Sequence, residues 1–147
     1  MSLKLKGYIL LPAHKQAGGF DHAAVHRGNR QLYVAHTAND AVDVIDCISD
    51  RYLHSIPDLT GVAGALVSDE RNLVFTSNRG EDTVSIFSPD TEDKASKIGV
   101  GIRPNGLSFD PKRGLLLAAN VGNPDIPNSH TLSIVDIQRR QMIHSIP

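Results

Sequence analysis

The stretch that decides the fold reads Leu32-Tyr33-Val34-Ala35-His36-Thr37-Ala38-Asn39-Asp40-Ala41-Val42-Asp43-Val44-Ile45-Asp46. A related stretch occupies 73–88, and a third opens at 115–120 and closes at 131–136. The spacing is 41 residues from Leu32 to Leu73 and 42 residues from Leu73 to Leu115. A repeat of this length is typical of a β-propeller blade, although some helical repeats share the period.

The pattern within each repeat favours strands over helices. Apolar residues alternate with small or polar ones at Val42, Val44, Val84, Ile86, Leu132 and Ile134, which is the period of a β-strand. Clusters of Asn, Asp, Gly and Pro bound these short stretches, as turns do. The predicted strands are 22–26, 32–36, 41–46 and 52–56; 65–67, 73–77, 83–87 and 97–100; and 106–109, 115–119, 131–136 and 141–146.

The sequence therefore predicts a single all-β domain, an incomplete β-propeller of about three four-stranded blades at 20–60, 61–101 and 102–147. One additional strand is expected at Tyr8–Leu11. The first two strands of each unit are almost continuously apolar, which suits burial on both faces. The third strands alternate, which suggests a position nearer the rim. Two hairpin turns are expected at 27–30 and 110–114, where Gly and Asn would supply positive φ.

Composition excludes several function classes. The chain has 147 residues, 15 basic and 16 acidic side chains, and a formal net charge of -1, so no cationic surface favours nucleic acid or an anionic membrane. No apolar run approaches the roughly 18 residues of a membrane span. Cys47 is the single cysteine, which excludes an intrachain disulfide. A cytoplasmic location is the default expectation, or a periplasmic or secreted one if an export signal has been removed.

The first repeat resembles a known family. Its 32–39 segment, followed by Val42-Asp43-Val44-Ile45-Asp46, is similar to the YVTN repeat of YncE-like β-propellers, and the resemblance extends from about Phe20 to the end of the chain. Such propellers usually have seven blades. The resemblance therefore implies a ring of which this chain carries three blades, so we expect self-association or a missing remainder of the propeller.

A shorter segment, Pro104-Asn105-Gly106-Leu107, resembles a motif of the gluconolactonase family of propellers. In that family the Asn binds a divalent metal, so the resemblance implies a metal near Asn105. Further acidic ligands have no match in this sequence. A metal-dependent, lactonase-like hydrolase is therefore the alternative to a non-catalytic propeller that binds a ligand or a protein. No nucleophile elbow, phosphate-binding loop or HExxH zinc motif is present.

The candidate ligand-binding residues come from the loops that a propeller opens on one face of its channel, where a rigid scaffold positions variable side chains. Aligning the units places His22, Ala63 and Asn105 at the entry to the inner strands, and Thr37, Asn78 and Asn120 in the next loop, with Arg79 directly after. The site prediction is therefore His22, Asn78, Arg79, Asn105 and Asn120, with catalytic residues left unassigned and a small molecule as the expected ligand.

Three further positions carry expectations. His26 aligns with core residues and should be packed. Gly106 stands at the mouth of an inner strand, where a tight turn would need positive φ. The segment 121–130 lengthens the third unit, and insertions in a repeat often map to the binding face.

Overall fold

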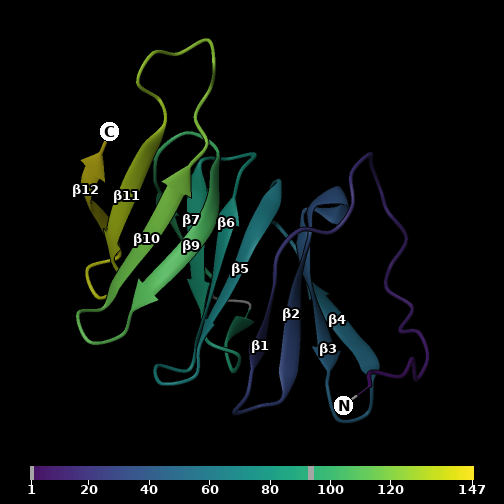
Figure 1. The fold of residues 1–147 in the computed structure, drawn as a ribbon. Coiled ribbons are helices and arrows are strands. Elements are labelled where there is room, and N and C mark those ends of the chain that lie inside the picture. The colour runs from purple at the N-terminus through teal and green to yellow at the C-terminus, as the bar shows by residue number, and fades with distance from the viewer. Residues whose placement is uncertain (1, 93–94) are drawn as a thin grey trace.

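The computed structural model describes residues 2–92 and 95–147, and over these the chain is almost entirely strand and turn (Figure 1). None of its helical segments has the length and apolar character of a membrane span. Apart from a one-turn 3₁₀ helix, η1 (Thr37–Asn39), the elements are β1 (Ala23–His26), β2 (Gln31–His36), β3 (Ala41–Asp46), β4 (Arg51–Ile56), β5 (Val62–Ser68), β6 (Leu73–Asn78), β7 (Thr83–Phe87), β8 (Ser96–Gly99), β9 (Pro104–Asp110), β10 (Leu115–Asn120), β11 (Thr131–Asp136) and β12 (Gln141–Ile146).

The strands form three antiparallel sheets, each in sequence order, which we call blade 1 (β1–β4), blade 2 (β5–β8) and blade 3 (β9–β12). The twelve strands predicted for the blades are confirmed, with bounds that differ by at most three residues. The pairing register repeats between blades: the matched pairs are Tyr33 and Val44, Phe75 and Ile86, and Leu117 and Ile134. Figure 1 shows the blades side by side, with the inner strands β1, β5 and β9 neighbouring one another.

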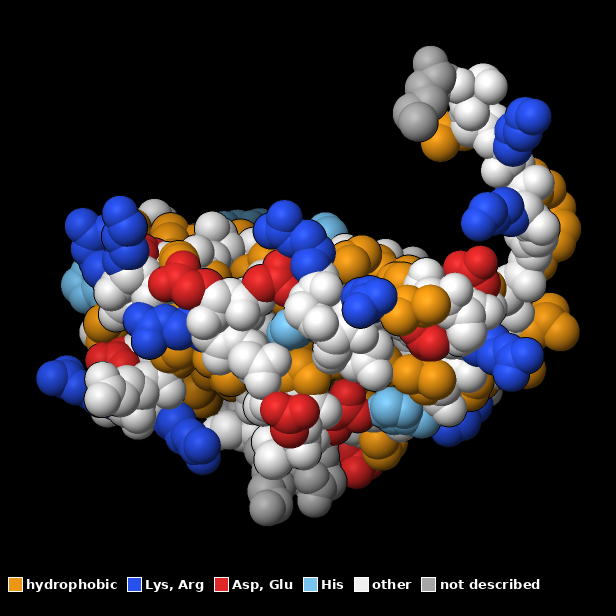
Figure 2. All heavy atoms as spheres, turned by 90° about the horizontal axis from the view of Figure 1, so that it is seen from below, with side chains coloured by type: hydrophobic (Ala, Val, Ile, Leu, Met, Phe, Trp, Pro, Cys, Tyr) orange, Lys and Arg blue, Asp and Glu red, His pale blue; other side chains and the backbone are white. Residues whose placement is uncertain are grey.

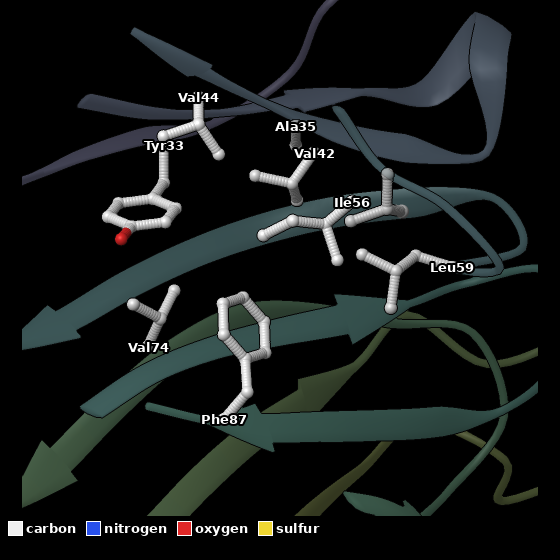
Figure 3. Close-up of a cluster of buried hydrophobic side chains, with 9 residues drawn as sticks. Tyr33, Ala35, Val42, Val44, Ile56, Leu59, Val74 and Phe87 are labelled. Atoms are coloured by element: carbon white, nitrogen blue, oxygen red, sulfur yellow. The ribbon is translucent and has the colours of Figure 1, made fainter. Parts of the chain in front are cut away.

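The blades are joined by two apolar cores, one on each side of blade 2. Between blades 1 and 2, Tyr33, Val42, Val44 and Ile56 pack against side chains of the second blade (Figure 3). The contributing residues of blade 2 and its entry loop are Leu59, Val62, Val74 and Phe87. The second core joins Phe75, Val84 and Ile86 to Leu116, Ala118 and Val135 of blade 3. Blade 2 is therefore apolar on both faces, because each face is covered by a neighbour.

An aspartate fastens each of the first two blades to the chain that follows it. Asp40 and Asp82 both adopt left-handed backbone conformations, with φ of 51° and 54°. The Asp40 carboxylate accepts the N–H of Gly61 at 2.7 Å, and the Asp82 carboxylate accepts the N–H of Arg103 at 2.8 Å. Asp can occupy this conformation because its short side chain bonds nearby backbone groups.

The left-handed turn residues differ in part from those predicted. At matched positions of the first hairpin of each blade, Arg30, Asn72 and Gly114 have φ of 59°, 51° and 66°. Gly114 and Asn72 are the residue types expected there. In the 27–30 turn the prediction of Gly or Asn is wrong, because the left-handed residue is Arg30. The hairpin geometry decides which residue is left-handed, and a residue with a Cβ at that place pays the steric cost of a positive φ.

Gly106 also departs from the prediction, because it lies in β9 without a positive φ. A Cβ placed on it would meet only the Cβ of Ala119, at 3.9 Å. The left-handed residue at this entry is Arg103, with φ of 54°. The left-handed turn therefore lies three residues before the predicted place, and Gly106 lies where the pairing of β9 with β10 shifts register.

The predicted strand at Tyr8–Leu11 is absent. These residues have no regular structure, and the side chains of Tyr8 and Leu10 are 86% and 89% exposed. A strand requires a hydrogen-bonded neighbour, and in the described part of the chain each sheet contains only its own four strands.

The third strands are more buried than their alternation suggested. Five of the six residues of β3 are buried, including Asp43 and Ile45 on the side that faces away from blade 2. Asp43 can be buried because polar side chains of its own blade pair with it, as described below. Alternating polarity therefore does not mark an exposed face in this blade.

Candidate functional site

The loops that enter the inner strands and those that follow the second strands meet at one end of the blades. There a shallow cavity of about 380 Å³ is lined by Thr37, Gly61, Arg79, Gly80 and Arg103. These residues come from the loops that follow β2 and β6 and from the segments that lead into β5 and β9. Figure 1 shows the long loop between β10 and β11 standing above the sheets at the same end. We call this end the mouth.

Two predicted site residues, His22 and Arg79, lie at the mouth and share one carboxylate. The Nδ1 atom of His22 is 2.8 Å from Oδ1 of Asp21, and the side chain of His22 is 54% exposed. Arg79 donates from Nη2 to Oδ2 of Asp21 at 2.7 Å. Asp21 therefore links the two predicted residues, one from blade 1 and one from the loop after β6.

The strand register corrects the alignment of His22. Ala23 pairs with Val34, Ala65 with Thr76 and Leu107 with Ala118. Counting back from these pairs makes Asp21 the equivalent of Ala63 and Asn105, with His22 one residue later. The error follows from the spacing of 41 residues between Leu32 and Leu73, because the strand register makes Leu32 the equivalent of Val74 instead.

Arg103 is a mouth residue that the sequence prediction missed. It is exposed, lines the cavity with Arg79, and has the same left-handed backbone as Gly61 at the matched position, where φ is 61°. Its only signal in the sequence is that an arginine stands where the previous repeat has glycine.

Asn78 and Asn120, also predicted site residues, point into their blades instead of toward the cavity. Asn78 is fully buried and donates from Nδ2 to the hydroxyls of Thr83 and Ser85, at 2.9 and 2.8 Å. Asn120 is 5% exposed and donates to Thr131 and Ser133, both at 2.9 Å. Each amide fastens the end of the second strand to the third strand of the same blade.

Asn105 does not provide a metal site that fits the gluconolactonase resemblance. Its side-chain oxygen is buried without a hydrogen-bond partner among the described residues, while its main-chain oxygen accepts the Ser77 hydroxyl at 2.6 Å. Hard divalent cations take about six to eight oxygen ligands, among which carboxylates are the usual charged ones. Within residues 2–92 and 95–147, no three His, Cys, Asp or Glu side chains are grouped to hold a metal.

Blade 1 contains a buried histidine–aspartate pair that sequence reasoning missed. His36 and Asp43 are both fully buried, with Nδ1 of His36 2.7 Å from Oδ2 of Asp43. The hydroxyl of Ser55 donates to the other carboxylate oxygen of Asp43 at 2.5 Å, and Tyr52 bonds Ser55 at 2.9 Å. The sequence does contain a signal for this pair: when the repeats are aligned by strand register, His36 stands where blades 2 and 3 have Asn.

The N-terminal segment covers this pair. The rings of His14 and Phe20 lie 5.0 and 4.3 Å from the ring of His36, measured between centroids. The segment is fixed by Asn39, whose side chain accepts the N–H of Lys15 at 2.8 Å and donates to the carbonyl of Ala13 at 3.1 Å. Nε2 of His36 is buried without a partner in the described part of the chain. His26 is also buried, at 3% exposure, as predicted.

The inserted loop at 121–130 forms a turn of its own. The Ser129 hydroxyl donates to the carbonyl of Asn123 at 2.8 Å, and it accepts the N–H of the same residue, also at 2.8 Å. Gly122 has φ of 74°, and a Cβ there would lie 2.7 Å from the Ser129 hydroxyl. The loop stands at the mouth, but none of its residues lines the cavity between Arg79 and Arg103.

Comparison with known proteins gives a likeness in structure alone. No protein-family model matches the chain, and no curated protein matches its sequence. A solved chain titled Kuenenia stuttgartiensis Hydrazine Synthase is similar over 95% of this chain, with a TM-score of 0.76 and 17% sequence identity. This chain spans 39% of the length of that chain. At such low identity the likeness shows the fold, an all-β arrangement of β-propeller-like blades.

Proposed function

We propose that the chain is a non-catalytic binding propeller of the YVTN-repeat kind that holds a small oxyanion at its mouth. The observation that carries the proposal is the cavity that Arg79 and Arg103 line together. The YVTN assignment rests on the repeats at 32–46 and 73–88. Guanidinium groups donate several N–H bonds in a planar fork, which suits carboxylates and phosphates.

The two arginines have different roles in this proposal. Arg79 is already held by Asp21 at 2.7 Å and is 29% exposed, so its guanidinium is positioned before the ligand arrives. Arg103 is exposed and makes no ion pair among the described residues, so its charge is available. His22, on the other oxygen of Asp21, adds a second polar group beside Arg79.

Isothermal titration calorimetry with inorganic phosphate and with succinate tests the proposal. Arg103→Gln should weaken binding of the better probe at least tenfold, because it removes the free cation and leaves the Arg79–Asp21 pair in place. Arg113→Gln is the matched control, since Arg113 is exposed in the hairpin at the other end of blade 3. Equal losses in both variants, or no binding of either anion by the unaltered chain, would rule out an oxyanion site at the mouth.

A further inference from the structure

The outward face of blade 3 repeats the apolar residues with which blade 1 contacts blade 2. In blade 1 these are Tyr33, Ala35, Val42, Val44 and Ile56, and in blade 3 they are Leu117, Ala119, Leu132, Ile134 and Ile146. The register is the same in both: Val42 pairs with Ala35 and Ile56, as Leu132 pairs with Ala119 and Ile146. The two faces therefore have the same construction, residue for residue.

The two faces differ in exposure. In blade 1 the first four residues are fully buried and Ile56 is 5% exposed. In blade 3, Ile146 is 41% exposed, Ala119 is exposed, and Leu117, Leu132 and Ile134 are only partly covered. An apolar surface of this kind on a soluble chain usually marks an interaction site.

The internal interface shows what covers such a face. Against blade 1, blade 2 places Val74 and Phe87, which pair with each other across β6 and β7. The matched pair in blade 1 is Leu32 with Ile45, on the side that faces away from blade 2. In blade 2, Val62 pairs with Asn78. The matched residues of blade 1 are Phe20 and His36, whose rings are in contact. Ile45 is only 6% exposed, so the accessible apolar residues of this face are Leu32 and its partner Val25, which is 49% exposed. These match Val74 and Val67, which blade 2 places in the core with blade 1.

We propose that blade 3 of one copy stacks on the outward face of blade 1 of a second copy. Such a head-to-tail contact, repeated once, closes a ring of six blades about a two-fold axis. Propellers use about four to eight blades, and heterologous contacts form rings when their rotation closes. Leu117 of one copy would then lie against Leu32 of the other, as Tyr33 lies in one core with Val74 within the chain.

The N-terminal arm is compatible with this contact. Residues 2–10 are exposed, and Figure 2 shows an arm that extends beyond the body of the molecule. The segment after it, at Ala13–Gly19, bonds the loop at Ala38 and Asn39. The N–H of Ala38 bonds the carbonyl of Gly19, as the matched N–H groups of Gly80 and Gly122 bond the loops that enter their own blades. The segment therefore runs along blade 1 as the entry loops run along blades 2 and 3.

Sedimentation equilibrium of the full chain at micromolar concentration is the test, with circular dichroism to confirm folding. The unaltered chain should have twice the mass of 15.9 kDa. Ile134→Asp and the milder Ile146→Asp should weaken association at least tenfold, whereas Ile126→Asp should not. Ile126 is the matched control because it is 45% exposed in the 121–130 loop, away from the face.

Mixing two variants tests the head-to-tail geometry. Ile134→Asp disables the blade 3 face and Leu32→Asp disables the blade 1 face, so neither variant should form closed dimers alone. An equimolar mixture should form an open dimer through its one intact pair of faces. A monomeric unaltered chain, a dimer that Ile134→Asp and Ile146→Asp leave intact, or a Leu32→Asp chain that still dimerises fully would overturn the proposal.

Discussion

Blades 1 and 2 share one backbone register but place different chemistry at the same point. Where the second strand ends, blade 2 has Asn78, which donates to Ser85 on the third strand at 2.8 Å. Blade 1 has His36 and Asp43 at these two positions, 2.7 Å apart and fully buried. Blade 3 repeats the neutral arrangement with Asn120 and Ser133. One position of the repeat thus holds either an amide and a hydroxyl or a titratable pair.

The difference shows that the repeat keeps a polar link between the second and third strands, whereas the residue types that form the link can vary. Both versions satisfy the buried donors that face the third strand, which a buried polar group requires. The His36–Asp43 version makes a larger demand, because a buried carboxylate must be paired and hydrogen-bonded. Ser55 meets that demand on the other oxygen of Asp43. The two residues of each pair must therefore change together.

The largest expected effect is that of removing Asp43. Asp43→Ala leaves His36 and Ser55 buried without their shared partner, and breaking a buried pair costs about 3–5 kcal/mol. The matched change in blade 2, Ser85→Ala, should cost only about 1 kcal/mol, because a neutral hydrogen bond is lost. Urea unfolding curves measure both. Equal costs would mean that the two links are energetically alike.

Exchanging the pair tests whether the two versions are interchangeable. The double change His36→Asn with Asp43→Ser gives blade 1 the residues of blade 2. It should be less destabilising than the sum of the single changes, with a coupling free energy of about 1–3 kcal/mol, because the residues are in direct contact. The double-mutant cycle in urea gives this value, and strict additivity would contradict a specific pair.

The entries to blades 2 and 3 extend the comparison to the backbone. Gly61→Val should destabilise by about 1–3 kcal/mol, since its φ is 61° and a Cβ would lie 2.6 Å from the Gly80 nitrogen. Gly106→Val should change stability by less than about 0.5 kcal/mol, because Gly106 has no positive φ and a Cβ there would meet only the Cβ of Ala119, at 3.9 Å. Chemical denaturation midpoints decide. A large loss at Gly106 would show that the entry to β9 is the constrained one.

The smallest expected effect at neutral pH concerns Tyr33, which stands where blade 2 has Phe75. Burial raises the pKa of Tyr33 from 10.0 to about 12. The folded state therefore holds this proton more tightly, so the contribution to stability is complete below pH 10 and is lost as pH rises through about 12. Tyr33→Phe should remove this alkaline loss. Thermal melts across that range, with absorbance at the phenolate band, provide the measurement.

The fold was predictable because period, alternation and turn residues agree in each repeat. The failures have local causes. Tyr8–Leu11 has the composition of a strand but no neighbouring strand in the described sheets, and a single window of sequence does not contain that information. Gly106 was favoured for a turn that Arg103 makes, because residue type alone suggested glycine.

The site was predictable only to the level of the loops. His22 and Arg79 do lie at the mouth, but Asp21, which joins them, has no motif of its own. Asn78 and Asn120 were assigned to the loop because they follow the apolar run. As last residues of β6 and β10, their side chains point back across the sheet. Successive side chains of a strand point to opposite faces. An error of one residue in where the strand ends therefore reverses the expected direction.

The aspartate links between blades have a consequence for local opening. The amides of Gly61 and Arg103 are bonded to the carboxylates of Asp40 and Asp82, each on the preceding blade. Deuterium can reach either nitrogen only when that loop lifts from the blade before it. Their exchange rates thus report two separate junctions, and Asp40→Asn should leave the Arg103 rate unchanged if each junction opens alone. A common rate for both would mean that the three blades open together as one cooperative unit.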